Sequence, residues 1–260
     1  MMTSPTVCGR APCASPGESE RRNHTMPQTT QTVPTPQAAQ PPKPKPPEPP
    51  PEFQENDIAT MDATALIRIL TDASSTEFQK AKACQRTGEL GPREAVPALS
   101  ALLSNEKLNT YARYGLEPIA DPSVDDALRT GLSKLKGNLL IGVINSIGKR
   151  RDRKAGPALA KMIYDADGDV ARAAAMALGN IGGVSAMQEL QTAIGKTKGM
   201  TRMAVADASL VCAERLLAEG QRAQALELYA SLSAPGMPKS ARLAAMQGIV
   251  REETSTSRPR

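Results

Sequence analysis

Basic side chains that could bind phosphate gather in one short segment of the chain. The run KRRDRK holds five cations in six positions and lies between two expected helices. Such a cluster could neutralise nucleic-acid phosphates, but the run has no interleaved aromatic side chains on which bases could stack. A solvated, charged turn is the preferred interpretation, and a polyanion site is the alternative. The five cations are Lys149, Arg150, Arg151, Arg153 and Lys154.

Three carboxylates at alternate positions invite a calcium interpretation. They belong to Asp165, Asp167 and Asp169. An EF-hand loop counted from the first of them would need Gly at position 170 and Glu at position 176, where the chain has Val170 and Met176. We therefore expect no metal site here, but a solvated turn in which Asp169 caps the helix that follows.

The sequence offers no set of residues with catalytic spacing. The only histidine, His24, lies in a Pro-rich head, so the folded part has no imidazole base for a Ser or Cys nucleophile. Cys84 and Cys212 fall inside expected helices, as small buried hydrophobic residues do. Cys8 and Cys13 supply two ligands where a structural zinc site needs four. We predict no catalytic residue, no metal, no cofactor and no enzymatic activity.

One expected helix carries two tyrosines and an arginine close together, at positions 111, 113 and 114. Tyrosine and arginine are enriched in the centres of protein–protein interfaces. Packing of the tyrosines against the next structural unit is the alternative. With two arginines on later helices, the candidate partner-binding surface consists of Tyr111, Arg113, Tyr114, Arg172 and Arg202.

The elements that must position these side chains are helices. The chain is 40% hydrophobic but only 2% aromatic, a composition that favours helices packed through Ala, Leu and Ile over a sheet. Apolar periodicity and Gly or Pro punctuation predict twelve helices and no strand. The expected helices are 62–71 and 76–89, 94–104 and 109–118, 124–135 and 138–148, 156–164 and 169–181, 185–195 and 200–219, and 221–233 and 239–250.

Apolar residues recur along these helices with a period near 30. Those that close successive helices lie 29, 28 and 34 residues apart, and leucines in the helices that follow lie 29, 31 and 31 residues apart. Repetition at this period with two helices per unit predicts an α-solenoid. The first set is Leu90, Ile119, Ile147 and Ile181, and the second is Leu99, Leu128, Leu159 and Leu190.

The most regular copy is 169–194, DVARAAAMALGNIGGVSAMQELQTAI, which predicts a helical hairpin broken at Gly182-Gly183. Its Asp169-Val170 start, triple alanine and ALG-x-IG ending resemble the short bacterial HEAT repeat, also called the HEAT-like or phycobilisome-lyase-type repeat. The resemblance covers roughly 61–250. The family pattern places Arg directly after the Val, but here Ala171 stands there, so we expect no regular ladder of buried Arg–Asp contacts.

The predicted fold is all-α, a right-handed α-solenoid (superhelix) of about six HEAT-like helix pairs. We expect a disordered Pro-rich tether at 1–56, the solenoid at 57–251 and a disordered tail at 252–260. The first 55 residues hold 14 of the 22 prolines and few core-forming residues, a composition typical of an extended polyproline spacer.

The resemblance implies a non-catalytic scaffold that binds protein partners on the curved surface of the solenoid. Two alternatives remain open, a bilin-lyase-like accessory subunit and a nucleic-acid-binding solenoid that uses the basic turn at 149–154. No run reaches the ~20 apolar residues of a membrane span, and the N-terminus lacks the apolar core of a secretory signal. We expect a soluble, cytoplasmic monomer, or an exported protein if translation starts at Met26 or Met61.

Overall fold

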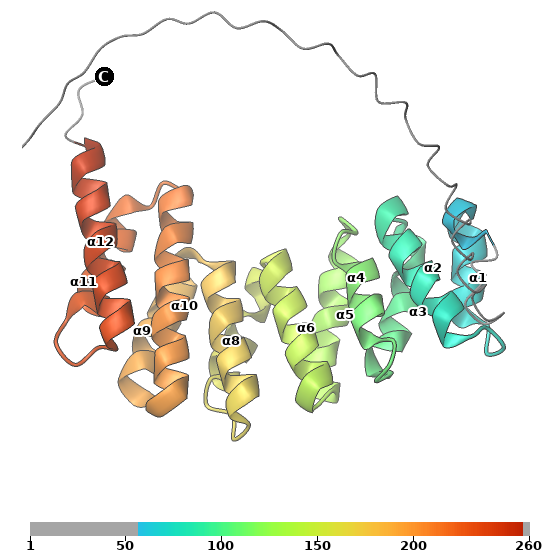
Figure 1. Ribbon diagram of the computed structural model, residues 1–260, viewed down its shortest axis with the longest axis horizontal. Helices are drawn as coiled ribbons and strands as arrows, with labels where there is room; N and C mark the ends of the chain where they lie inside the picture. The colour runs from blue at the N-terminus through green and yellow to red at the C-terminus, as the bar shows by residue number, and fades with distance from the viewer. Residues whose placement is uncertain (1–56, 257–260) are drawn as a thin grey trace, which may run out of the picture. The chain divides into compact units, whose positions relative to one another are not determined.

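The computed structural model describes residues 57–256, with side chains to residue 254. Within this range the chain forms twelve α-helices and four short 3₁₀ turns, with no strand, so the predicted all-α repeat fold is confirmed (Figure 1). The tether predicted for 1–56 lies outside the described residues, as does the end of the predicted C-terminal tail, 257–260.

The helices alternate between two layers. The first-helix layer contains α1 (Ala63–Thr71), α3 (Val96–Ala101), α5 (Pro122–Lys134), α7 (Gly156–Met162), α9 (Gly183–Lys196) and α11 (Arg222–Ser233). The second-helix layer contains α2 (Glu77–Leu90), α4 (Asn109–Leu116), α6 (Gly137–Arg150), α8 (Gly168–Ile181), α10 (Gly199–Ala218) and α12 (Lys239–Thr256). The 3₁₀ turns are η2 (Ile58–Thr60), η3 (Arg93–Ala95), η4 (Leu102–Ser104) and η5 (Arg153–Ala155).

Each first helix packs on the second helix that follows it, which gives six pairs. The second helices also contact one another in the order α2, α4, α6, α8, α10 and α12, so this layer is continuous (Figure 1). The hairpin predicted at 169–194 corresponds to α8 and α9. Because α8 pairs with α7 and α9 with α10, that hairpin joins two neighbouring pairs.

The repeated leucines lie in the core between the layers. All four leucines of the predicted set, from Leu99 to Leu190, are fully buried. Three of the residues predicted to close successive helices are buried as well, whereas Leu90 closes α2 as predicted but is 44% exposed. Leu90 is the last residue of α2, and Gly91 turns the chain immediately after it with a φ of 68°.

Several helix boundaries differ from their predicted positions, and three of the differences have a clear structural form. The cap of α8 is Asp167 and not Asp169, because Asp167 Oδ1 accepts hydrogen bonds from the backbone N–H groups of Asp169 (2.9 Å) and Val170 (3.4 Å). The helix predicted at 94–104 is α-helical only in α3, and 3₁₀ turns flank it. The last helix, α12, runs on to Thr256, five residues beyond the predicted end of the solenoid, 251.

A carboxylate–phenol–guanidinium contact fixes the last three helices to one another. Glu214 of α10 accepts hydrogen bonds from the Tyr229 hydroxyl of α11 (2.5 Å) and from Arg251 of α12 (2.7 Å). Burial alone would raise the pKa of the Glu214 carboxyl, but these two hydrogen bonds bring the pKa below its ordinary value. The contact lies at the predicted end of α12 and stabilises the helix there.

Glycines let neighbouring second helices approach backbone to backbone. A Cβ added at Gly148 of α6 would lie 2.8 Å from Ala177 Cα of α8. A Cβ added at Gly179 of α8 would lie 2.4 Å from the Ala208 carbonyl oxygen of α10. Both distances are below van der Waals contact, so these positions require glycine for the observed spacing of α6, α8 and α10.

Candidate functional site

The two tyrosines of α4 face solvent from the second-helix layer. Tyr111 is 39% exposed and Tyr114 is 56% exposed. Residues three apart lie on neighbouring parts of one helix face, so the two phenol rings belong to one patch. Their exposure favours the partner-binding interpretation over packing against the next repeat.

A surface pocket of about 270 Å³ lies beside Tyr114. It is lined by the ends of three consecutive second helices and by the residues that follow α4, so it crosses the boundaries between repeats. Its lining combines an aromatic ring and a proline with two carboxylates and an ammonium group. The lining residues are Gly88, Glu89, Tyr114, Glu117, Pro118 and Lys149. We name this pocket and Tyr111 together the tyrosine patch.

Arg113, predicted for the same surface, points instead towards α6. Its Nε donates to Asn109 Oδ1 (2.9 Å) and its Nη1 to Ser146 Oγ (3.3 Å), and its side chain is 17% exposed. Burial lowers the pKa of the Arg113 guanidinium, and the nearby carboxylate of Glu117 opposes that shift. A Cβ at Gly142 would lie 2.7 Å from the Arg113 Nε, so the small residue makes room for this contact. Arg113 therefore positions α4 on α6.

The other two predicted arginines lie on α8 and α10. Arg172 pairs with Asp169 one turn earlier in α8. Arg202 of α10 has its Nη2 3.8 Å from the sulfur of Met237. Both helices belong to the same layer as α4, but α6 stands between α4 and α8. The five predicted residues thus share a layer without forming one cluster.

Arg150, at the end of α6, serves the fold. Its Nη1 donates to the backbone carbonyl oxygens of Glu117 (2.8 Å) and Ile119 (2.7 Å), and its Nε lies 2.5 Å from Asp125 Oδ1. These carbonyls belong to the segment after α4, whose helix end leaves carbonyl groups in need of donors. Arg150 therefore connects α6 to the previous repeat and is withdrawn from the candidate polyanion patch.

Two more cations of the basic turn form ion pairs with other repeats. Lys149 Nζ lies 2.6 Å from Glu117 Oε2, and Arg153 Nη2 lies 2.8 Å from Glu219 Oε1. Arg151 and Lys154 are exposed, and neither forms an ion pair with the residues that the structure describes. Three of the five predicted phosphate-binding cations are thus paired with carboxylates of the chain itself.

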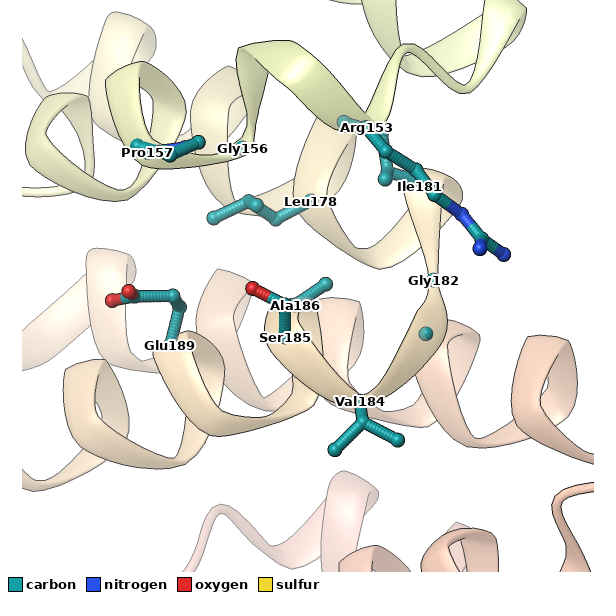
Figure 2. A pocket seen from close by; sticks show the side chains of 11 residues that line it. Arg153, Gly156, Pro157, Leu178, Ile181, Gly182, Val184, Ser185, Ala186 and Glu189 are labelled. Atoms are coloured by element: carbon teal, nitrogen blue, oxygen red, sulfur yellow. The ribbon is translucent and has the colours of Figure 1, made fainter.

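A smaller pocket, of about 120 Å³, lies at the joint of α8 and α9 (Figure 2). Leu178, Ile181 and Pro157 make its lining largely apolar, while Ser185 and Glu189 enter it from α9. Its eleven lining residues include no His, Cys or Lys, and the one arginine, Arg153, is the partner of Glu219. A serine without a neighbouring base is a weak nucleophile.

The cysteines of the folded part are buried. Burial raises the pKa of the Cys84 thiol and of the Cys212 thiol to about 12. Since the thiolate is the reactive and metal-binding form, neither thiol is suited to nucleophilic catalysis at neutral pH.

The acidic turn before α8 uses its carboxylates on the backbone. Asp165 Oδ1 accepts from the Asp167 N–H (2.8 Å), and Asp167 itself caps the helix. Among residues 57–256, no three His, Cys, Asp or Glu side chains are grouped so that they could hold a metal ion. None of the helices described is both long and apolar enough to cross a membrane.

Comparison with known proteins identifies the repeat. Residues 125–209, from α5 into α10, match the family model of HEAT repeats. A search of curated proteins found no match to the chain. The family match covers the most regular part of the stack, including 169–194, and it agrees with the two-layer packing described above.

Proposed function

We propose that this HEAT-repeat protein is a non-catalytic scaffold that binds a protein partner at its tyrosine patch. HEAT repeats generally mediate protein–protein interactions. The observation that carries the proposal is the exposure of Tyr111 and Tyr114 on one face of a second helix. Within a protein whose core is built from Ala, Leu and Ile, two solvent-facing phenol rings have no evident packing role.

The patch has the features of an interface centre. Tyrosine buries a large area with two side-chain torsions to fix, so it loses little entropy on binding. The pocket beside Tyr114 is large enough to take an apolar side chain of a partner. Glu89, Glu117 and Lys149 surround it with charge, and such a polar rim around an apolar centre is typical of interfaces.

One observation favours this proposal over the nucleic-acid alternative. Lys149, Arg150 and Arg153 pair with carboxylates, so two cations of the basic turn have no carboxylate partner among the described residues. Two are too few for the multiple phosphate contacts of a nucleic-acid site.

The proposal is tested by site-specific photo-crosslinking of the full chain in its native cells. A photoreactive phenylalanine analogue replaces Tyr114 in one variant and Tyr111 in a second. Tyr164 supplies the matched control, because it is 50% exposed and follows α7 in the first-helix layer. We expect the same partner adduct from positions 111 and 114 and none from position 164. Absence of adducts at both patch positions, or equal yield at the control position, would refute the proposal.

A further inference from the structure

The last helix, α12, exposes an apolar face. Leu243 is 49% exposed, Met246 is 48% exposed and Val250 is 58% exposed. The opposite face is buried against the preceding helices. There Gly248 is so close to the ring of Tyr229 that an added Cβ would lie 2.7 Å from it. Exposed apolar residues that share one helix face are typical of an interaction surface.

The exposed face continues in both directions with charged residues. Lys239 precedes the apolar residues and Glu253 follows them, and both are exposed. The five residues are separated by four, three, four and three positions, which is the spacing of a coiled-coil seam. We name this set, Lys239, Leu243, Met246, Val250 and Glu253, the α12 seam.

The α12 seam is complementary to itself when reversed. Lys239 lies seven residues before Met246 and Glu253 lies seven residues after it. If a second copy of α12 packs antiparallel with the two-fold axis near Met246, each Lys239 meets a Glu253 of the other copy. The two Met246 side chains then meet at the centre, and Leu243 lies within one residue of the level of Val250 in the other copy. In a parallel pair, by contrast, Lys239 would face Lys239.

We propose that the protein forms a homodimer in which two copies of α12 pack antiparallel through the α12 seam. Such an interface is isologous, because the same residues contribute from both copies. A second copy is the occupant for which we argue, because the exposed ammonium group at one end of the seam and the exposed carboxylate at the other end are complementary when two copies of α12 run antiparallel. The proposal replaces the monomer expected from the sequence. It does not depend on the tyrosine patch, which lies on α2, α4 and α6.

The oligomeric state tests the proposal. Sedimentation equilibrium of the full chain under reducing conditions, at up to about 100 µM, is expected to give twice the 27.5 kDa of one chain. Met246→Lys is expected to give a monomer, and so is Val250→Lys. Met203→Lys changes an equally exposed methionine (44%) on α10 and is expected to leave the dimer intact. Circular dichroism verifies that each variant is folded.

A monomeric parent protein at these concentrations would overturn the proposal. So would a dimer that survives both α12 substitutions or is lost on Met203→Lys.

A charge exchange tests the antiparallel arrangement. Lys239→Glu and Glu253→Lys each place like charges at both ends of the α12 seam, so each variant alone is expected to dimerise at least several-fold more weakly. Mixed in equal amounts, the two variants are expected to form heterodimers. In the heterodimer, the carboxylate introduced at position 239 of one variant lies beside the ammonium group introduced at position 253 of the other variant. A merely structural loss in either variant would not be reversed by mixing. Failure of the mixture to recover dimers overturns the antiparallel arrangement.

Discussion

Substitution of Gly179 by alanine should separate α8 from α10. The added methyl group would lie 2.4 Å from the Ala208 carbonyl oxygen and 3.0 Å from its Cα. Both obstructing atoms belong to the backbone, so no side chain can rotate away to relieve the contact. One helix must shift, and the contact of α8 with α10, which continues the second-helix layer, must open.

The magnitude follows from two opposing effects. Overpacking of a well-packed interface costs about 1–3 kcal/mol, and backbone obstruction places this case at the upper end. Alanine in place of glycine in a helix gains about 1 kcal/mol. The net loss is therefore about 2 kcal/mol. For a domain of this size, 1 kcal/mol shifts the Tm by about 2–4 °C, so the Tm should fall by about 4–8 °C.

Thermal unfolding followed by far-UV circular dichroism measures the effect. Gly195→Ala is the matched control, because an added Cβ in α9 would meet no atom within 4 Å. That variant should be unchanged or more stable by up to about 1 kcal/mol. A Gly179→Ala variant with the Tm of the parent, or above it, would show that α8 and α10 do not approach as described.

Three further predictions concern single side chains. Arg150→Met removes the donor from the carbonyl groups after α4 and should lower the free energy of unfolding, measured in urea, by about 2–4 kcal/mol. Arg151→Met, at an exposed neighbour, should change it by no more than about 0.5 kcal/mol. Equal effects would contradict the assigned role of Arg150. The pKa of the Glu214 carboxyl is lowered in the folded state. The stabilisation that its negative charge provides is therefore fully present above the ordinary pKa of 4.5. This stabilisation is lost as the pH falls through the pKa of the folded state. Glu214→Gln should thus destabilise the protein more at pH 7 than at pH 3. A pH-independent loss would refute this origin. In a variant with serine at positions 8 and 13, the thiols of Cys84 and Cys212 should not react with a maleimide at pH 7 until the protein is unfolded. The reason is that burial raises the pKa of both thiols. Rapid labelling of the native protein would contradict their burial.

The repeat architecture could be predicted because it depends on local periodicity. Leu99 and Leu190 recur at the unit length and are both fully buried. The sequence could not decide between Asp167 and Asp169 as the cap of α8, because both are good caps and the choice depends on how the preceding turn folds. Leu90 closes α2 as predicted, but apolar character alone does not say whether the last residue of a helix reaches the core, and Leu90 is exposed.

The candidate surface could be predicted only in part, because exposure depends on how one helix is rotated against the next. Arg113 and Tyr114 are adjacent in sequence, yet the Arg113 side chain packs against α6 and the Tyr114 side chain is exposed to solvent. The decisive partner of Arg113, Ser146, lies 33 residues away. The spacing of the α12 seam is visible in the sequence, but its exposure follows from the packing of Gly248 on Tyr229.

The affinity of the full chain for the partner identified by crosslinking tests the scaffold function most directly. Isothermal titration calorimetry compares the parent protein with Tyr114→Ala and with Tyr164→Ala, two exposed tyrosines on different layers. Loss of an interface tyrosine from the centre of a binding surface raises the Kd at least about tenfold. We predict that increase for Tyr114→Ala and an unchanged Kd for Tyr164→Ala. Equal affinities for all three proteins would contradict a scaffold that binds through the tyrosine patch.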